Sequence, residues 1–351
     1  MAPLAVIVGC SGPVLTAEER VFFRDANPWG FILFSRNVET PSQVSRLCAG
    51  LREAVGRDCL IFVDQEVGRV QRLKAPHWKA YPSGAKLAAL YQRDAGQGLE
   101  ACYLSYRLIA DDLRSVGITA NCAPVLDLPQ PDADPIISDR AFGTNTPQII
   151  DLAHASMAGL MKGGVVPVVK HIPGHGRARV DSHKALPKID ENFSQLCQTD
   201  FVPFKQLNDA PMAMTAHAVY SCTSGEAITV SPKAFDTLIR AEIGYDGLVM
   251  TDDLDMKALS GNLVRKTEQS LAAGCDIALQ CSGQIDAMVK VAKGARPLIG
   301  KALERAKIAQ NCTDYASEFE REAAEVKLST LMQGVADVDI ARAPMSLVES
   351  T

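Results

Sequence analysis

The strongest constraint on the fold is a pattern that the chain repeats eight times, in which a short apolar run is followed by a polar, helix-like segment. Most runs are continuously apolar and rich in β-branched residues, which is typical of parallel strands covered on both faces. We predict eight strands, at LAVIVG (4–9), GFILF (30–34), CLIFVD (59–64), ITANCAPV (118–125), VVPVVKH (165–171), PMAMTAH (211–217), GLVMTDD (247–253) and CDIALQC (275–281).

Helical segments lie between these strands. The first, TAEERVFFRDA (16–26), opens with the T-x-x-E spacing of a capping box. Four of the later segments end at glycine, the residue that most often terminates a helix. The other predicted helices are 41–55, 96–117, 146–164, 231–244 and 267–274.

Alternation of strands and helices predicts an α/β fold with a parallel sheet. Eight such units within 351 residues predict a single-domain (β/α)8 TIM barrel. A doubly wound open sheet is the alternative, but the phosphate-binding pattern G-x-G-x-x-G does not follow the first strand. We assign residues 1–330 to the barrel domain, with the charged segment 297–328 as a C-terminal helical extension, and residues 331–351 to a tail.

Composition excludes several classes of partner. The net charge is −5 and no long basic run occurs, so we expect no nucleic acid partner. The apolar runs are too short to cross a bilayer, and the N-terminus lacks the features of a signal peptide. Ten cysteines are scattered without a C-x-x-C pair, as expected for buried free thiols in a reducing compartment. We therefore expect a cytoplasmic protein without a membrane partner, and a monomer.

Polar residues mark the C-terminal ends of most predicted strands. In a barrel these ends converge on one face, where the active site lies. Because the positions are spread along the whole sequence, their shared placement favours a functional face over strands that merely stop at polar residues. The residues are Asp64, Asp127, Lys170, His171, His217, Asp252 and Asp253.

The segment VVKHIPGHGRARVDSHKALP (168–187), which covers the end of the fifth strand and the loop after it, holds three of the six histidines. Asp181 stands two residues before His183, so its carboxylate can accept the Nδ1 proton and fix the imidazole tautomer. This pair predicts an acid/base catalyst that works near neutral pH. The glycines Gly174 and Gly176 would let the loop move His183 in and out of the site.

A zinc site is the alternative reading of the same loop. His171 and His175 have the H-x-x-x-H spacing of a helical metal pair, but Pro173 and Gly174 between them argue against a helix. No third ligand stands at a useful spacing, so we expect no metal. His217 is compatible with either a structural or a catalytic role, whereas His77 and His154 read as structural.

Two adjacent acids end the seventh strand, in GLVMTDD (247–253). Successive side chains of a strand point in opposite directions, so only one of Asp252 and Asp253 should face the barrel mouth unless the strand has ended. One carboxylate nucleophile plus one acid/base group is the requirement for retaining glycoside hydrolysis. Here His183 would take the place of the usual second carboxyl group.

Several ordered motifs together resemble glycoside hydrolase family 3, specifically its bacterial β-N-acetylglucosaminidases. They are KHIPGHG followed by DSH and ALP (170–187), VDQEVGRVQRL (63–73), NCAPVLDL (121–128), SDRAFG (138–143) and MTDDLDM (250–256). The resemblance, over about residues 5–295, implies a single-domain barrel that removes terminal β-linked N-acetylglucosamine, notably from cell-wall muropeptides in the cytoplasm. It implies no cofactor, and a small saccharide or muropeptide as the only partner.

The same resemblance implies roles for individual residues. Asp252 matches the nucleophile, His183 the general acid/base and Asp181 the carboxylate that orients it. Residues that match positions holding the sugar are Asp64, Arg140, Lys170 and His171, with Arg69 near the same pocket.

The motifs depart from the family pattern at EVG (66–68), HIPGHG and TDDLDM, and RARV (177–180) is unusually basic. Val67 would narrow a loop near Asp64 and so affect substrate preference. Three alternatives stay open: phosphate instead of water as the acceptor, a substrate-assisted route through the acetamido oxygen with Asp252 and Asp253, and a non-catalytic sugar-binding barrel.

Overall fold

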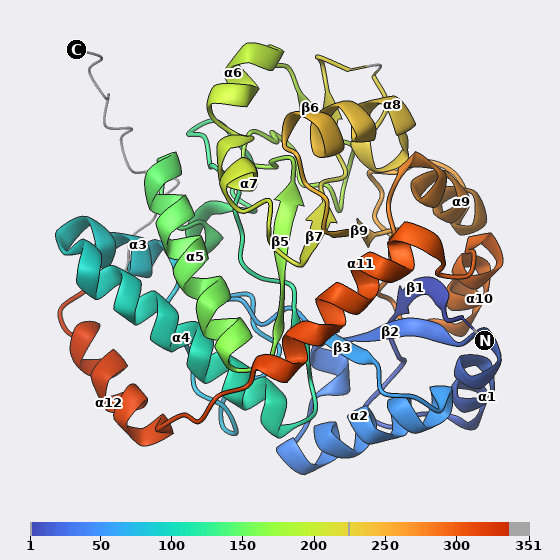
Figure 1. Cartoon of the computed structure of the whole chain (residues 1–351), viewed down its shortest axis with the longest axis horizontal. Helices are drawn as coiled ribbons and strands as arrows, with labels where there is room; N and C mark the ends of the chain where they lie inside the picture. Colours follow the sequence, from blue (N-terminus) through green and yellow to red (C-terminus); the bar gives the residue numbers. More distant parts are fainter. Residues whose placement is uncertain (1, 224, 337–351) are drawn as a thin grey trace.

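The computed structural model, which describes residues 2–223 and 225–336, contains eight parallel strands that close into a barrel (Figure 1). The strands neighbour one another in the order β1-β10-β9-β7-β5-β4-β3-β2. The TIM-barrel prediction is therefore confirmed and the open-sheet alternative is wrong. Each strand overlaps one predicted run: β1 (Leu4–Val8), β2 (Pro28–Leu33), β3 (Leu60–Val63), β4 (Ala120–Asn121), β5 (Val166–Ile172), β7 (Met212–Thr215), β9 (Leu248–Asp253) and β10 (Ile277–Gln280).

Helices surround the barrel, and side chains that precede them fix where they begin. Thr16 and Glu19 form the predicted capping box of α1, and Thr40 caps α2. Asn262 caps α9, which therefore begins earlier than predicted. The helices are α1 (Ala17–Ala26), α2 (Pro41–Val55), α3 (Gly84–Arg93), α4 (Ala95–Ser115), α5 (Thr146–Lys162), α6 (Phe193–Gln198), α7 (Val202–Gln206), α8 (Pro232–Ala234), α9 (Leu263–Ala273) and α10 (Ile285–Gly294).

Several elements differ from the prediction. The segment predicted as one helix at 231–244 is a short α8 that continues as a π-helix over Phe235–Glu242. Helices α3, α6, α7 and α10 were not predicted from the sequence. Nor were strands β6 (Lys188–Ile189) and β8 (Val219–Tyr220), which pair in parallel as a separate two-stranded sheet.

Strand β4 is much shorter than the predicted run 118–125. The chain turns after Asn121, whose carbonyl oxygen accepts the N–H of Ala123 at 2.8 Å. It then rejoins the barrel beside β5, where Val125 forms an isolated bridge with Lys170. The apolar run is therefore a strand with an interruption, which its hydrophobicity alone does not reveal.

The C-terminal extension consists of two helices, α11 (Gly300–Asn311) and α12 (Arg321–Leu331), instead of one. Arg305 of α11 binds Asp276 and Asp246, close to the starts of β10 and β9. Arg321 of α12 binds Asp111 and Asp112 of α4. The tail predicted at 331–351 lies outside the described residues from 337 onward, and the domain boundary stays a prediction.

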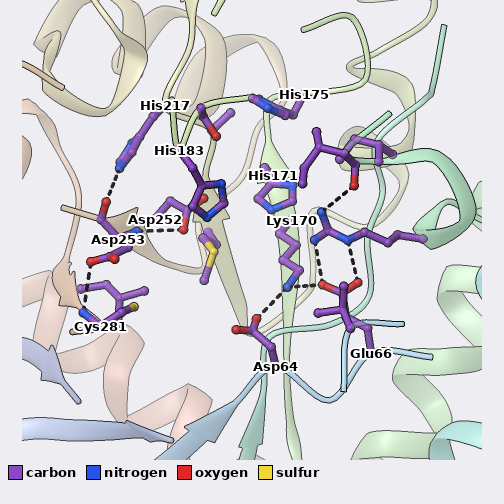
Figure 2. A pocket seen from close by; sticks show the side chains of 18 of the residues that line it. Asp64, Glu66, Lys170, His171, His175, His183, His217, Asp252, Asp253 and Cys281 are labelled. Atoms are coloured by element: carbon purple, nitrogen blue, oxygen red, sulfur yellow. Dashed lines mark hydrogen bonds and ion pairs between the residues drawn. The ribbon is translucent and has the colours of Figure 1, made fainter. Parts of the chain in front are cut away.

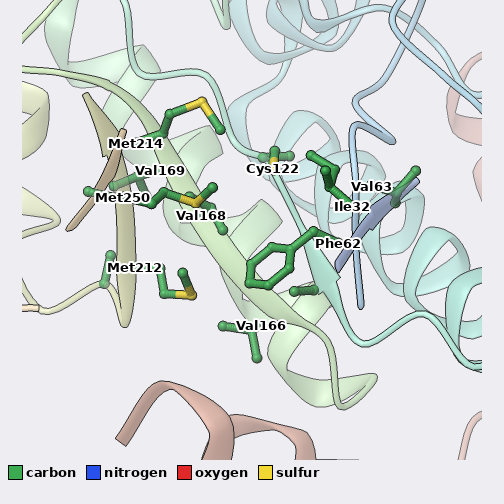
Figure 3. Close-up of a cluster of buried hydrophobic side chains, with 14 of the residues drawn as sticks. Ile32, Phe62, Val63, Cys122, Val166, Val168, Val169, Met212, Met214 and Met250 are labelled. Carbon is green, nitrogen blue, oxygen red and sulfur yellow. The ribbon is translucent and has the colours of Figure 1, made fainter. Parts of the chain in front are cut away.

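The barrel interior is filled by large apolar side chains. Figure 3 shows Phe62, Val166, Val168, Met212 and Met250 packed together between the strands. All five are essentially inaccessible to solvent. This core leaves the C-terminal ends of the strands as the place where polar side chains can gather. Within the described part of the chain, no helix has both the length and the apolar character needed to cross a membrane.

Candidate active site

A cavity of about 220 Å³ opens at the C-terminal ends of the barrel strands. Figure 2 shows its charged and imidazole side chains converging from β3, β5, β9 and the loop after β5. Asp181 reaches the cavity through its contact with His183. The other residues predicted for the site all line it: Asp64, Arg69, Arg140, Lys170, His171, His183 and Asp252.

Two β-bulges explain why neighbouring residues of one strand share this cavity. Between Lys170 and Ile172 of β5, the partner strand β7 advances by only one residue, so His171 is extra. Strand β9 likewise has one extra residue between Met250 and Asp253, opposite Ile277 and Leu279 of β10. A bulge redirects side chains that would otherwise alternate. Consequently both Lys170 and His171 line the cavity, as do both Asp252 and Asp253, and the expectation that only one of the two acids faces the mouth is wrong.

A chain of ion pairs forms one wall of the cavity. Lys170 Nζ lies 2.9 Å from Asp64 Oδ1 and 2.6 Å from Glu66 Oε1. Arg140 binds Glu66 with both Nε (2.9 Å) and Nη2 (2.8 Å), and Arg72 Nη2 lies 3.0 Å from Asp64 Oδ2. Two bonds from one guanidinium fix the orientation of the Glu66 carboxylate. Five charged side chains therefore hold one another in place before any substrate arrives.

The electrostatics of this wall keep its members charged. Burial raises the pKa of Asp64, but Lys170 and Arg72 outweigh burial and hold it well below its usual range. Burial likewise raises the pKa of Glu66, but Arg140 and Lys170 lower it overall to about 2. For Lys170, burial lowers the pKa, yet Asp64 and Glu66 raise it overall. Two carboxylates and the ammonium between them thus stay ionised at neutral pH.

His171 is oriented by a buried carboxylate. Its Nδ1 lies 2.6 Å from Oδ2 of Asp127, whose other oxygen accepts the backbone N–H of His175 at 2.6 Å. Asp127 has no exposed surface. Since a carboxylate accepts the Nδ1 proton, His171 directs Nε2 toward the cavity. The neighbouring His175 is buried, and burial together with His171 lowers its pKa to about 4, so this imidazole is neutral.

The two acids of β9 have different surroundings. Asp253 Oδ1 accepts the backbone N–H groups of Asp255 and Cys281, each at 3.1 Å, so its side chain ties β9 to β10. Asp252 Oδ1 accepts the N–H of Asp253 at 2.8 Å. Burial raises the pKa of Asp252, but His171 and His217 outweigh it and lower the pKa below its usual value. Asp252 is therefore the ionised carboxylate that is available to a ligand.

Burial has the opposite net effect on Asp253. It raises the pKa of this carboxyl to about 6, and the charges of Asp255 and Asp252 add to the effect, whereas the N–H group of Asp255 opposes it. Asp253 thus titrates close to neutral pH.

His217 has a structural environment. Its Nε2 lies 3.1 Å from the carbonyl oxygen of Asp253, which can only accept, so this nitrogen carries the proton. Its Nδ1 lies 2.9 Å from the hydroxyl oxygen of Thr229, which donates its own proton to the carbonyl oxygen of Ala216 at 3.1 Å. Burial lowers the pKa of His217, which disfavours its charged form. Of the two roles left open for His217, the geometry favours the structural one.

The predicted dyad forms within its loop. His183 Nδ1 lies 2.8 Å from Asp181 Oδ1, which also accepts the backbone N–H of His183 at 2.9 Å. Burial raises the pKa of Asp181, but both bonds from His183 outweigh it, so this pKa lies below its usual value. The His183 side chain is 65% exposed and Asp181 only 14%. With Nδ1 held, Nε2 is the nitrogen free to exchange protons in the cavity.

The two loop glycines are required for close packing. A Cβ on Gly176 would lie 1.9 Å from the carbonyl oxygen of Leu128. Gly174 has φ +141°, and a Cβ there would approach Asp200. Movement of the loop is untested, but contacts of the chain on both sides explain both glycines without it.

Other residues lie where the motifs alone did not place them. Arg69 lines the cavity mouth, but its guanidinium binds Asp139 at 2.7 Å and the carbonyl oxygen of Ile136 at 2.7 Å. Val67 is buried and does not line the cavity, so its side chain does not narrow the cavity directly.

Glu66 and Arg72 were not predicted as site residues. Their signal was present in VDQEVGRVQRL, but which cations they pair with appears only in three dimensions.

A metal ion has little support in the described residues. They contain no group of three or more His, Cys, Asp or Glu side chains arranged to hold one. His171 directs one nitrogen to Asp127, and its ring centre lies 5.7 Å from that of His175. The expectation that these histidines bind no zinc stays a prediction.

The chain resembles known glycosidases in sequence. A family model described as the glycosyl hydrolase family 3 N terminal domain matches residues 14–310. A protein named β-hexosaminidase from Alkalilimnicola ehrlichii is 36% identical over 281 residues, which cover 79% of this chain and 80% of that protein.

Solved structures share the fold of this chain. NagZ from Neisseria gonorrhoeae in complex with N-trifluoroacetyl-D-glucosamine has a TM-score of 0.85 at 28% identity, covering 95% of this chain and 99% of that one. NagZ from the same bacterium in complex with zinc ion has a TM-score of 0.84 at 26% identity, with the same coverage.

Proposed function

The chain belongs to glycosyl hydrolase family 3 and is a glycosidase, and from this premise we propose that it removes terminal β-linked N-acetylglucosamine with retention of configuration. Asp252 is the nucleophile, and His183 is the general acid and base, oriented by Asp181. One observation carries the proposal: an ionised carboxylate and a carboxylate-oriented imidazole line the same small cavity. Retaining hydrolysis needs one group of each kind on one bond.

The first step is glycosylation. Asp252 attacks the anomeric carbon, while His183, as imidazolium, donates its Nε2 proton to the departing glycosidic oxygen. In the second step neutral His183 takes a proton from water, which attacks the anomeric carbon and releases Asp252. The exposure of His183 and the depressed pKa of Asp252 support this division of roles.

Sugar binding is assigned to the charged wall and to the oriented imidazole. Asp64 and Lys170 present a carboxylate and an ammonium that can bond to sugar hydroxyls, and His171 presents Nε2. Arg140 and Arg69 complete the wall and the mouth. The cavity of about 220 Å³ is smaller than the roughly 300–1,000 Å³ typical of drug-sized sites, which suits one terminal sugar.

The natural substrate is proposed to be a muropeptide fragment of the cell wall, in peptidoglycan recycling within the cytoplasm. The relatives named β-hexosaminidase and the sugar in the NagZ complex support an N-acetylglucosamine substrate. The ten cysteines are all free, which suits a reducing compartment. The protein is proposed to act as a monomer without a cofactor.

The decisive experiment traps the covalent intermediate. The enzyme is incubated with a 2-fluoro or 5-fluoro β-glycosyl donor, and its intact mass and peptides are then measured. We expect one added glycosyl group on the peptide that contains Asp252. Label on another residue would reject the assignment, and no label together with tight binding of a thiazoline inhibitor would favour the substrate-assisted route. Product analysis with and without orthophosphate then identifies water or phosphate as the acceptor.

A further inference from the structure

The loop that carries His183 consists of two parts with different contacts. Residues 173–178 form the loop base and residues 179–187 the dyad segment. The base is held on several sides through its backbone: the Tyr220 hydroxyl donates to Gly174 O at 2.6 Å, and Gln130 N donates to Gly176 O at 3.1 Å. Asp134 N donates to Ala178 O at 2.7 Å.

Arg177 ties this base to the segment between β6 and α7. Its Nε lies 2.7 Å from Asp200 Oδ2 and its Nη1 lies 3.0 Å from Glu191 Oε1. Its Nη2 also donates to the Thr199 hydroxyl at 3.3 Å. The Arg177 side chain is 9% exposed and Asp200 only 1%. Each of the three guanidinium nitrogens thus has a partner, in a site where water competes little.

The dyad segment has weaker anchors. Arg179 pairs with Asp132, but these side chains are 73% and 64% exposed, and such surface pairs contribute little. Ser182 O accepts the N–H of Ala258 at 3.2 Å. At the far end, Pro187 O accepts the N–H of Val219 at 2.9 Å. Between these few backbone bonds, the orientation of His183 depends on how the segment leaves its base.

We propose that Arg177 is a positioning residue for the general acid, acting through the loop base on His183. The inference rests on the proposed role of His183. The sugar-binding side chains Asp64 and Lys170 have their own ion pairs on β3 and β5, and Arg177 contacts neither. The base does touch the sugar site once, through the N–H of His175 on Asp127, which orients His171. Loss of Arg177 should therefore impair proton donation more than sugar binding.

The contribution of a proton donor to kcat/KM grows with the pKa of the leaving group. The experiment measures kcat/KM for a series of aryl β-N-acetylglucosaminides with increasing leaving-group pKa, and the slope of log kcat/KM is compared between variants. Arg177→Gln should lose about 10–100-fold on the poorest leaving group and about 3-fold or less on the best, as expected for a misplaced catalytic group. Arg177→Lys keeps one charge without the fork and should lie between Arg177→Gln and the wild type.

Two further variants give the references. His183→Ala sets the slope expected without a general acid, and Arg179→Gln, two residues from Arg177, should match the wild-type slope. If His183→Ala leaves the slope unchanged, the proposed function fails. If His183→Ala steepens the slope and Arg177→Gln does not, only the present inference fails.

Removing Arg177 also leaves a buried carboxylate without its partner, which can destabilise the protein. The double variant Arg177→Gln with Asp200→Asn removes that uncompensated charge. This double variant should fold stably and keep the steeper slope, because the loop base still lacks the ion pairs of Arg177. A wild-type slope in a stable double variant would overturn the proposal.

Discussion

The Nζ atom of Lys170 lies 2.6 Å from Oε1 of Glu66, and each side chain is 3% exposed. The same carboxylate binds Arg140 through two guanidinium nitrogens. Glu66 therefore fixes the positions of the two cations that are proposed to contact the sugar.

Glu66→Gln should lower kcat/KM by a similar factor on substrates with good and with poor leaving groups. The amide keeps the shape of the side chain but loses the charge that fixes Lys170 and Arg140. Truncating one partner of a buried charged pair costs roughly 2–5 kcal/mol, so we expect a loss of about 10²-fold or more in kcat/KM. The measurement compares a disaccharide with an activated aryl glycoside, using Glu18→Gln at an exposed position as control. A loss confined to the disaccharide would contradict this role.

Asp252→Ala should lose nearly all turnover while the fold is preserved. No neighbouring side chain can form the glycosyl bond in its place, and removal of a nucleophile has reduced kcat by as much as roughly 10⁶-fold in another enzyme. Asp253→Asn should be milder, because an amide oxygen still accepts the N–H groups of Asp255 and Cys281. Steady-state rates and circular dichroism test both variants. Substantial residual turnover in Asp252→Ala would remove it as the nucleophile.

His183→Ala should lose roughly 10²–10⁴-fold in kcat/KM on a disaccharide, the range typical of general acid catalysis. On a dinitrophenyl glycoside the loss of kcat/KM should be small, because that group departs as an anion. Asp181→Asn should follow the same pattern by a smaller factor, since the imidazole keeps its place but loses its carboxylate. Lys170→Ala should instead reduce both activities alike. Equal losses for His183→Ala on both substrates would assign it to sugar positioning.

The titration of Asp253 should make stability depend on pH. Its folded pKa is about 6, against an ordinary value of 3.8, so between these values the folded state retains a proton that the unfolded state has lost. The stability gained from that proton is present below about pH 4 and is lost as the pH rises through 6. Relative to Asp253→Asn, the wild type should lose roughly 2–3 kcal/mol between pH 4 and 6.5. Urea unfolding at several pH values measures this, and a constant difference would refute it.

Gly176→Ala should disrupt the loop base. The new Cβ would lie 1.9 Å from the carbonyl oxygen of Leu128, a backbone atom that cannot rotate away. We expect destabilisation of roughly 1–3 kcal/mol, as for overpacked sites, and a loss of activity. Gly12→Ala is the matched control, because nothing lies within 4 Å of its Cβ position. Thermal unfolding of the two variants should separate them, and similar melting temperatures would show that the loop adapts.

The barrel and the location of its site could be predicted from sequence because they depend on local patterns. Continuous apolar runs specify buried strands, and polar residues such as Asp64 and Asp252 stand where the runs end. The break in segment 297–328 has a tertiary cause instead: the Arg107 guanidinium lies 4.0 Å from the Phe319 ring centre and donates to Ser317 O at 2.8 Å. Helices α3 and α10 were missed although each has apolar spacing of its own.

The site was predicted less completely for a similar reason. Adjacent charged residues in a sequence do not reveal which partner each will find, so Glu66 was not singled out. The bulges at His171 and in β9 have no local signature, because they depend on how many residues the neighbouring strand advances. Alternation was therefore the right rule for a regular strand and the wrong one for Asp252 and Asp253.

These two bulges also have an evolutionary consequence. Each adds one residue to a strand without opening the barrel, so deletion of that residue would restore regular pairing while turning a cavity side chain toward the helices. A descendant that lacks one residue within KHI (170–172) or TDD (251–253) would keep the barrel and lose its catalytic activity. A single-residue gap at either place in a relative would thus distinguish inactive copies of the scaffold from working enzymes.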